Sequence, residues 1–245
     1  TGFLGLGLTG NYLPPPGHPQ HPGPEYETLN ATYDVDLANQ LLDGVVSNRD
    51  GDGFRTLPNG DRLEIVIGGT AAFGPWPAIA ESVASMWEEV GVRARADIVE
   101  RSLLRSRQQA NGVMAYMWGP GRAVNLFVQS PWVNCAISCP WGRDWEIWYK
   151  SGGAEGTEPP PEVARLTELI DRGKGLPPAE ANPLAQEVYK FIIDEQMIIG
   201  TARRSPLVMG VTIINANLDN VPLSWANDTL FDTPFPSFPE QFFLK

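Results

Sequence analysis

Three short segments decide the fold of this chain: LEIVIGG (63–69), RARADIVE (93–100) and VMAYMWG (113–119). The first and third are apolar runs next to glycine, and the second alternates apolar with polar residues, so each predicts a β-strand. Between them, PAIAESVASMWEEV (77–90) and SLLRSRQQANG (102–112) carry apolar residues at helical spacing. This alternation of strands and helices predicts an α/β fold with a parallel sheet and right-handed crossovers.

Further elements are expected around this βαβαβ core. Apolar residues at helical spacing predict helices over 34–43, 161–173 and 182–196. Apolar runs rich in β-branched residues predict strands over 197–202 and 206–214.

Two stretches lack a convincing periodic pattern. Residues 1–32 include the proline-rich segment NYLPPPGHPQHPGPEYE, which excludes helix interiors and central strands. We expect an extended segment that lies on another surface. Residues 119–158 are rich in aromatic residues, and irregular structure is expected there.

The composition is that of a globular protein with an acidic balance. The 245 residues include 18 lysines and arginines against 29 aspartates and glutamates, which gives a formal net charge of −11. This balance argues against a nucleic-acid partner and against an anionic membrane surface. The sequence has neither a run of about 18 apolar residues nor a recognisable signal peptide. Its opening resembles the interior of a longer protein, so we expect a fragment.

Several short motifs suggest a cofactor or a metal, but each has a simpler explanation. GLGLTG (5–10) has the spacing of a dinucleotide-binding loop, yet the prolines that follow prevent the helix such a site needs. NRDGDG (48–53) resembles the start of a calcium loop, but Asn59 stands where a glutamate is required, which favours a turn. His18 and His21 have no cysteine nearby, and exposed loop histidines are favoured. We therefore expect no cofactor and no metal.

Cys135 and Cys139 are the only cysteines. A redox pair would favour C-x-x-C, and a zinc site would need two more ligands. In an exported protein, two cysteines four residues apart can close a small loop, so a disulfide is favoured over two free thiols.

Tryptophans gather after the third predicted strand. Ligands of open α/β sheets bind beyond the carboxyl ends of the strands, where aromatic faces stack on sugar rings or pack on peptide side chains. We place Trp118 and Trp132 in such a cleft, and expect Trp145 and Trp148 to be core anchors. The candidate ligand-binding residues are Trp118, Arg122, Asn125, Trp132 and Trp141.

Beyond these patterns, long segments of the chain resemble a known family, the extracellular solute-binding proteins of family 5, in their C-terminal part. These proteins are the peptide-, nickel- and oligosaccharide-binding receptors of ABC importers. The resemblance is carried, in order along the chain, by YDVDLANQLLDG (33–44), RDGDGFRTLPNGDRLEIVI (49–67), AESVASMWEEVGVRARADIVERSLLRSRQQANGVMAYMWG (80–119), WEIWYKSGGAEGTEPP (145–160), IIGTARRSPLVMGVTIINANLDNVP (198–222) and PEQFFLK (239–245).

The resemblance implies a bilobal receptor of the type II periplasmic-binding architecture, with the ligand enclosed between the lobes. Residues 33–200 would form most of one α/β lobe, with a βαβαβ core and a mixed sheet. Residues 1–32 would be an extended segment of the other lobe, and residues 201–245 would be return strands and a tail toward it.

One departure from the family concerns the ligand. In dipeptide-binding relatives, an aspartate shortly after the tryptophan of the third strand holds the ligand's amino group. Here Gly121 lies near that position and Arg122 beside it. A carboxylate for an ammonium group is absent and a cation is present, which favours a sugar or an anionic ligand over a free peptide N-terminus.

The function that follows is binding rather than catalysis. We expect a periplasmic or extracellular receptor, with a possible lipid anchor, that captures an oligopeptide or a similar solute and delivers it to the permease subunits of an ABC transporter. An oligosaccharide receptor is the alternative within the family. A hydrolase that uses Asp144 and Glu146 as acid and base is the alternative from another class.

Overall fold

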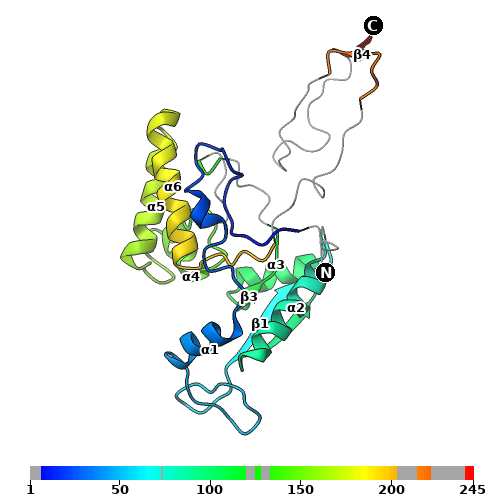
Figure 1. The fold of residues 1–245 in the computed structure, drawn as a ribbon. Helices are drawn as coiled ribbons and strands as arrows, with labels where there is room; N and C mark the ends of the chain where they lie inside the picture. Colours follow the sequence, from blue (N-terminus) through cyan, green and yellow to red (C-terminus); the bar gives the residue numbers. More distant parts are fainter. Residues whose placement is uncertain (1–6, 73, 120–124, 128–132, 203–213, 222–240) are drawn as a thin grey trace.

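A parallel sheet of three strands forms the centre of the computed structural model (Figure 1). The structure describes residues 7–72, 74–119, 125–127, 133–202, 214–221 and 241–245. The strands lie in the order β2-β1-β3. Their bounds are Glu64–Gly69 for β1, Arg93–Ile98 for β2 and Ala115–Tyr116 for β3.

The predicted βαβαβ order and the parallel pairing are confirmed. β1 pairs with β2 from Glu64↔Arg93 to Gly69↔Ile98, and with β3 at Ile67↔Ala115. The described strands of this sheet are all parallel. The strand at 206–214, which would make the sheet mixed, lies almost wholly outside the described residues.

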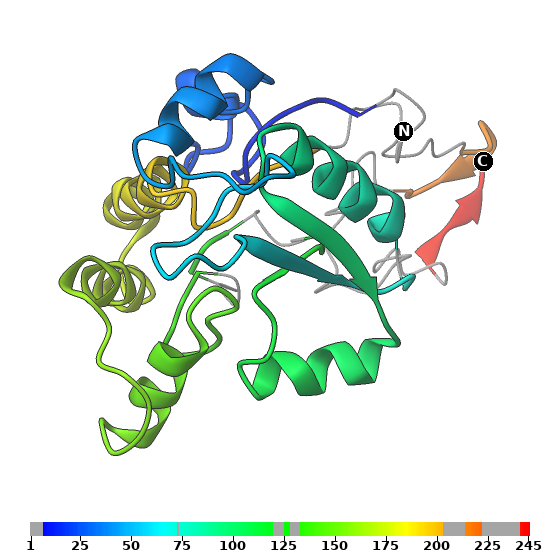
Figure 2. The same ribbon diagram turned by 90° about the horizontal axis from the view of Figure 1, so that it is seen from below.

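One helix covers each face of the sheet. α2 (Trp76–Glu89) and α3 (Arg101–Gln109) lie on opposite sides of β1 and β2 (Figure 2). On the α2 side, small and branched residues interdigitate in a buried cluster of Ile67, Ala80, Ala84 and Ala94. On the α3 side, a Cβ at Gly68 would lie 3.0 Å from Leu104, so a glycine in β1 lets this helix pack closely.

The predicted helix ends are set by local signals. α1 (Val35–Asp43) begins at Asp34, whose carboxylate accepts a hydrogen bond from the Leu37 amide, as an N-cap does. α2 ends before Gly91, which has a φ of 83° that few other residues adopt. None of the α1 residues is buried.

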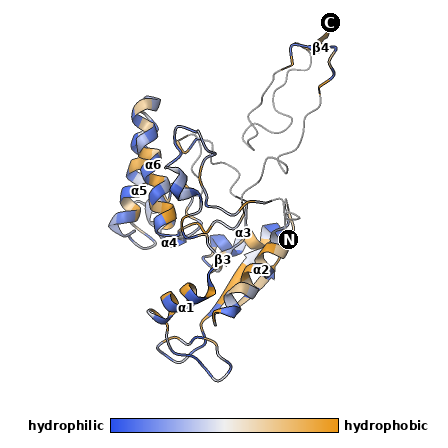
Figure 3. Ribbon diagram, in the orientation of Figure 1, coloured by the Kyte–Doolittle hydropathy of each residue, from blue (hydrophilic) through white to orange (hydrophobic). Residues whose placement is uncertain are grey.

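A second core lies between α5 (Pro161–Gly173) and α6 (Pro178–Asp194). Figure 3 shows hydrophobic residues on β1 and on both of these helices. α5 has the predicted bounds, whereas α6 begins four residues before the predicted Asn182 and contains Pro183 in its interior. A proline favours the first turn of a helix. Here Pro178 takes that role, and Pro183 is tolerated one turn further on.

The N-terminal segment is attached to this second core. Tyr12 and Leu13 are buried in the same cluster as the residues of α5 and α6. The Asn11 side chain donates to the carbonyls of Tyr26 and Leu29, at 3.0 and 2.8 Å, and so closes the segment on itself. The segment contains a short 3-10 helix, η1 (Pro24–Glu27). The assignment of residues 1–32 to a second lobe stays a prediction.

Two predictions of secondary structure were wrong. Residues 143–151, within the stretch expected to be irregular, form helix α4 (Arg143–Ser151). Residues 197–202, expected to be a strand, form no regular element. The remaining described strands are β4 (Leu218–Asp219) and β5 (Phe243–Leu244), which pair antiparallel.

None of the helices in the described ranges combines the length and hydrophobicity that crossing a bilayer requires.

Replacing Tyr189 with phenylalanine is expected to stabilise the protein by about 1 kcal/mol. The Tyr189 side chain is fully buried, and its hydroxyl has no hydrogen-bond partner among the described residues. Burial, with a smaller contribution from Tyr12, raises the pKa of Tyr189 well above its usual value, as expected of a desolvated phenol. Phenylalanine keeps the ring in edge contact with Tyr12, at 6.0 Å between centroids. Urea unfolding measures the effect, and a loss of stability would contradict the absence of a partner.

Candidate functional site

The carboxyl edge of the parallel sheet brings together residues from three separate connections. Thr70 follows β1 and is buried, Arg101 opens α3 just after β2, and Trp118 follows β3. In open α/β sheets this edge is where ligands bind, because the loops that leave the strands there converge. Trp118, predicted from the sequence as a cleft residue, lies at this edge.

Arg101 and Trp118 contact each other across this edge. The guanidinium carbon of Arg101 lies 5.8 Å from the centre of the Trp118 ring. This distance is within the range of a cation–π interaction, which is about 6 Å. The sheet order is β2-β1-β3, so the Arg101 side chain reaches past the end of β1 to meet the residue that follows β3. The contact therefore links two strands that are not neighbours.

Trp76 is a third residue of this edge, and it was not predicted from the sequence. Its ring lies between two glycines: a Cβ at Gly74 would be 2.5 Å from the ring, and a Cβ at Gly119 would be 2.7 Å from it. Any larger residue at either position would displace the ring. The indole nitrogen is buried and has no hydrogen-bond partner among the described residues. Trp76 thus holds together the connections that leave β1 and β3.

A sequence signal could have identified Trp76. It lies between Pro75 and Pro77, in the connection that follows the first predicted strand. In a parallel sheet, such a connection belongs to the ligand-binding edge.

The other candidate ligand residues are placed differently. The Asn125 side-chain oxygen accepts hydrogen bonds from the Gln20 side chain and from the Phe127 amide, at 3.2 and 3.0 Å, so it stabilises a turn. Trp141 packs edge-on against Trp145, with 5.9 Å between ring centroids. Arg122 and Trp132 lie outside the described residues. Their assignment to a ligand site, like that of Asn125 and Trp141, stays a prediction.

Cys135 and Cys139 are joined by a disulfide, and both are buried beneath α4. Trp145 packs against the cluster that they form with Val163, consistent with a structural role for this tryptophan. The Cys139 amide donates to the buried carboxylate of Glu146, at 3.1 Å. α4 and the disulfide loop therefore form one packed unit.

Glu146 is an ion-paired structural carboxylate. Burial alone would raise its pKa, but hydrogen bonds from Lys150, Arg143 and the Cys139 amide outweigh burial, so the pKa lies below its usual value. Asp144, by contrast, is exposed on the helix. Residues two apart on a helix point in different directions, so the two carboxylates do not form the acid–base pair that the hydrolase hypothesis needs.

Replacing Glu146 with glutamine is expected to lower the free energy of unfolding at neutral pH. It should also make that free energy vary less as the pH falls into the acid range. A folded-state pKa below the ordinary 4.5 adds stability above that value, and this stability is lost as the pH falls through the folded pKa. Urea midpoints measured at neutral pH and at about pH 3 test this. Glu155→Gln, at an exposed position, is the matched control. An identical stability difference between wild type and variant at both pH values would contradict the expectation.

The acidic loop at 48–53 forms a turn whose carboxylates are neutralised within the protein. Asp50 and Asp52 both pair with Arg62, each at 2.6 Å. Antiparallel bridges join Arg49 to Arg55 and Thr56 to Arg62, as expected of a hairpin-like connection. The Oδ1 atom of Asp50 also accepts hydrogen bonds from the Asp52 and Phe54 amides, as expected of a turn.

The two histidines are not exposed as predicted: both are half-buried, and the His21 side chain is only 9% exposed, because the proline-rich segment folds over it. The Nδ1 atom of His18 accepts from the Gln20 amide, and that of His21 accepts from the Gly23 amide. Across the part of the chain that the structure describes, no three metal-binding side chains gather in one place.

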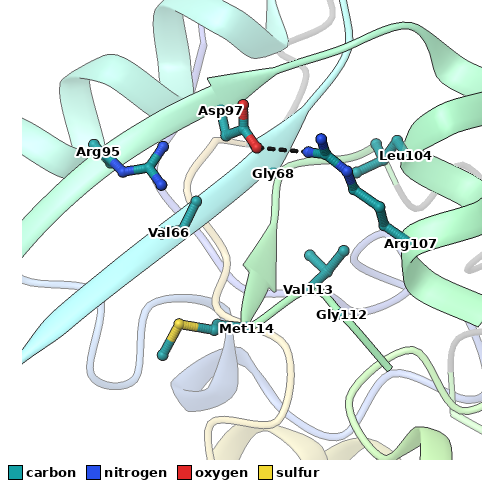
Figure 4. Close-up of a pocket in the computed structure, with 9 residues that line it drawn as sticks. All are labelled: Val66, Gly68, Arg95, Asp97, Leu104, Arg107, Gly112, Val113 and Met114. Atoms are coloured by element: carbon teal, nitrogen blue, oxygen red, sulfur yellow. Dashed lines mark hydrogen bonds and ion pairs between the residues drawn. The ribbon is translucent and has the colours of Figure 1, made fainter. Parts of the chain in front are cut away.

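A cavity of about 230 Å³ lies on the α3 face of the sheet (Figure 4). Both apolar and charged residues line it, and two of the charged ones, Arg107 and Asp97, pair at 2.7 Å. Arg95, also in the lining, pairs with Glu64. Its lining comes from β1, β2, α3 and residues 112–114 before β3, and it includes none of Trp76, Arg101 and Trp118, so it is separate from the edge where Trp118 lies.

The chain resembles solved structures of solute-binding proteins. An oligopeptide-binding protein, OppA, superposes with a TM-score of 0.76 at 27% identity, over 99% of this chain and 40% of that one. AppA from Bacillus subtilis, solved with a nonapeptide, has a TM-score of 0.62 at 17% identity, over 98% of this chain and 43% of that one. This chain thus spans about two fifths of the length of these proteins.

A sugar-binding relative shares the fold at lower identity. MelB from Agrobacterium fabrum, solved with stachyose, has a TM-score of 0.60 at 13% identity, over 70% of this chain and 26% of that one. No curated protein sequence matches significantly.

A family model gives the assignment. The model described as bacterial extracellular solute-binding proteins, family 5, middle part, matches residues 1–132, which is more than half of the 245 residues. This match agrees with the α/β architecture described above. The protein therefore belongs to family 5 of the bacterial extracellular solute-binding proteins, which are binding proteins of ABC importers rather than enzymes.

Proposed function

We propose that this chain is part of the substrate-binding component of an ABC importer. The protein captures an oligopeptide or a similar small solute between two lobes and delivers it to the permease subunits in the membrane. Residues 33–200 form most of one lobe, and residues 1–32 and 201–245 belong toward the other. The protein acts in the periplasm or outside the cell, where its relatives act.

The observation that carries this proposal is the convergence of Trp76, Arg101 and Trp118 at one edge of the sheet. Two aromatic rings and a guanidinium group supply packing, stacking and hydrogen bonding for a small solute. Closure of a second lobe over this edge would exclude water and strengthen each polar contact. Binding of this kind needs no nucleophile or base, and the ligand favours the closed population of the receptor.

An oligosaccharide is the second candidate ligand, because two tryptophans lie at the same edge. The face of an indole ring packs on the apolar face of a sugar as readily as on a peptide side chain. The experiment below therefore includes both solute classes.

The test is ligand-induced stabilisation of the whole protein. A solute present at 100 times its dissociation constant is expected to stabilise the folded state by about 2.7 kcal/mol. Thermal unfolding is measured against panels of di- to nonapeptides and of neutral oligosaccharides, and mass spectrometry checks that the bound solute is recovered intact. Trp118→Ala is expected to weaken binding of every solute that the wild type binds. If no panel member shifts the unfolding midpoint, or if the solute is cleaved, the proposed function is wrong.

A further inference from the structure

We propose that residues 18–23 form a pH-sensitive latch, which attaches the N-terminal segment to the connection after β3 and which protonation of His18 releases. In the closed latch the His18 imidazole is neutral. In the open latch it is charged, and the hydrogen bonds that hold Gln20 are lost. This inference goes beyond the proposed function, because it concerns how the fold responds to acid and not which solute the protein binds.

The latch consists of two successive turns of the same kind. The sequence HPQHPG (18–23) contains a histidine, a proline and a third residue twice over. In each turn the Nδ1 atom of the histidine accepts a hydrogen bond from the amide two residues further on, that of Gln20 at 3.2 Å and that of Gly23 at 3.1 Å. A neutral imidazole has one nitrogen that accepts, whereas an imidazolium donates from both. Protonation of either ring therefore breaks its turn.

Gln20 is the residue that the first turn holds in place. It is buried, and its side-chain nitrogen donates to the Asn125 side-chain oxygen at 3.2 Å. Its side-chain oxygen accepts from the Leu126 amide at 2.9 Å, and Leu126 is buried in the core between α5 and α6. Gln20 thus attaches the N-terminal segment to residues 125–127, which lie in the connection that follows β3.

The surroundings of His18 oppose a positive charge. Burial, and after it the neighbouring His21, lower the pKa of His18 from its ordinary 6.5. The closed latch therefore binds a proton at His18 less readily than the open one. A group whose pKa is lowered in this way contributes stability above its ordinary pKa, and this stability is lost as the pH falls through the lowered value. Acid below pH 6.5 should thus favour the open latch.

His21 lies beside two carboxylates of η1. The Glu27 carboxylate is 3.6 Å from the His21 Nε2 atom, and the Glu25 carboxylate lies against Gly23. An imidazolium at His21 is therefore paired with Glu27. Its positive charge adds to the cost of a second one at His18, so the two rings do not contribute equally.

Helix α6 also packs near the loop, but its charges act elsewhere. Lys190 lies 5.6 Å from the centre of the Tyr26 ring, and burial followed by Asp194 raises the pKa of the Tyr26 phenol. The loop itself meets a neutral side chain of this helix, Gln186, which donates to the Pro19 carbonyl at 2.9 Å. The acid response is therefore assigned to the imidazoles.

Hydrogen exchange of backbone amides in the whole protein tests the latch. Protection factors, which correct for the intrinsic pH dependence of exchange, are measured from about pH 7.5 to about pH 5, where histidine titrates. In the wild type, the Gln20 and Leu126 amides are expected to lose protection about 3- to 10-fold on acidification, the range of one hydrogen bond. The loss should have its midpoint below pH 6.5. The Ile170 amide, inside α5, is the reference and should keep its protection.

Three variants separate the titrating group from the fold. His18→Asn introduces a side chain that does not titrate and whose oxygen can accept from the same amide, so it should keep the neutral protection and lose the pH dependence. His21→Asn removes the neighbouring charge, so the loss of protection should move to a higher pH. Gln20→Ala should remove the protection of the Leu126 amide at every pH, because its acceptor is gone.

The outcomes decide as follows. If the wild type keeps the protection of the Leu126 amide over the whole range, or if His18→Asn loses it with the same midpoint as the wild type, the inference is overturned. If His18→Asn is unprotected already at neutral pH, the midpoint in His21→Asn decides, and a midpoint that is unchanged or lower overturns the inference. The experiment uses no solute, so its result and that of the test of the proposed function are independent.

Discussion

Replacing Arg55 with methionine is expected to lower the free energy of unfolding by about 3–5 kcal/mol, because several buried polar groups lose their partner at once. The Arg55 side chain is fully buried. Its Nε donates to the Val90 carbonyl at 2.8 Å, and its Nη1 donates to the Val46 carbonyl and to the Asp43 carboxylate, both at 2.7 Å. Its Nη2 donates to the Asn39 side-chain oxygen at 2.9 Å.

These hydrogen bonds make Arg55 the connection between three parts of the structure. Asn39 and Asp43 belong to α1, Val46 lies just beyond that helix, and Val90 ends α2. No residue of α1 is buried, so apolar packing contributes little to holding this helix in place. The loss of Arg55 should therefore release α1 as well as destabilise the fold.

An exposed arginine provides the matched control for Arg55. The Arg95 side chain is 54% exposed and pairs with Glu64 at 3.3 Å. Surface pairs of this kind contribute about 0–1 kcal/mol, so Arg95→Met should have a small effect. Urea unfolding followed by tryptophan fluorescence gives both values, and hydrogen exchange at α1 reports its release. Equal losses in the two variants would show that Arg55 has no special role.

Replacing Ile170 with alanine is expected to lower the free energy of unfolding by about 2–5 kcal/mol, through lost apolar burial and the cavity left behind. Ile170 is fully buried in the core between α5 and α6, where Tyr12 and Leu13 of the N-terminal segment also pack. A cavity at this position removes contacts from both helices and loosens the attachment of the segment.

Two measurements check this second prediction. Urea unfolding compares Ile170→Ala with Ile199→Ala, which removes a side chain on a residue that is 60% exposed and should change stability by less than about 1 kcal/mol. Limited proteolysis follows cleavage within residues 11–29, which should be faster in Ile170→Ala than in the control. If cleavage there is unchanged, the segment is held independently of this core.

Much of the fold could be predicted because its signals are local. The strands at 63–69 and 93–100 and helices α1, α2, α3 and α5 follow from apolar periodicity, and Asp34 and Gly91 mark helix ends through hydrogen bonding and a positive φ. Helix α4 was missed although Trp141, Trp145 and Trp148 recur at helical spacing. The glycines and prolines around it are typical of irregular structure. The helix is stabilised by a tertiary contact, the burial of Glu146 against the disulfide loop.

The sequence by itself determined the α/β class, the order of strands and helices, and the position of Trp118 after the third strand, at the carboxyl edge of the sheet. Only the tertiary structure decided which residues meet Trp118. Trp76, Arg101 and Trp118 lie far apart along the chain, and they converge because β1 lies between β2 and β3 in the sheet. Apolar periodicity indicates which face of each segment is buried and which faces water. The order in which strands pair depends on packing between distant segments, and no short stretch of sequence contains that information.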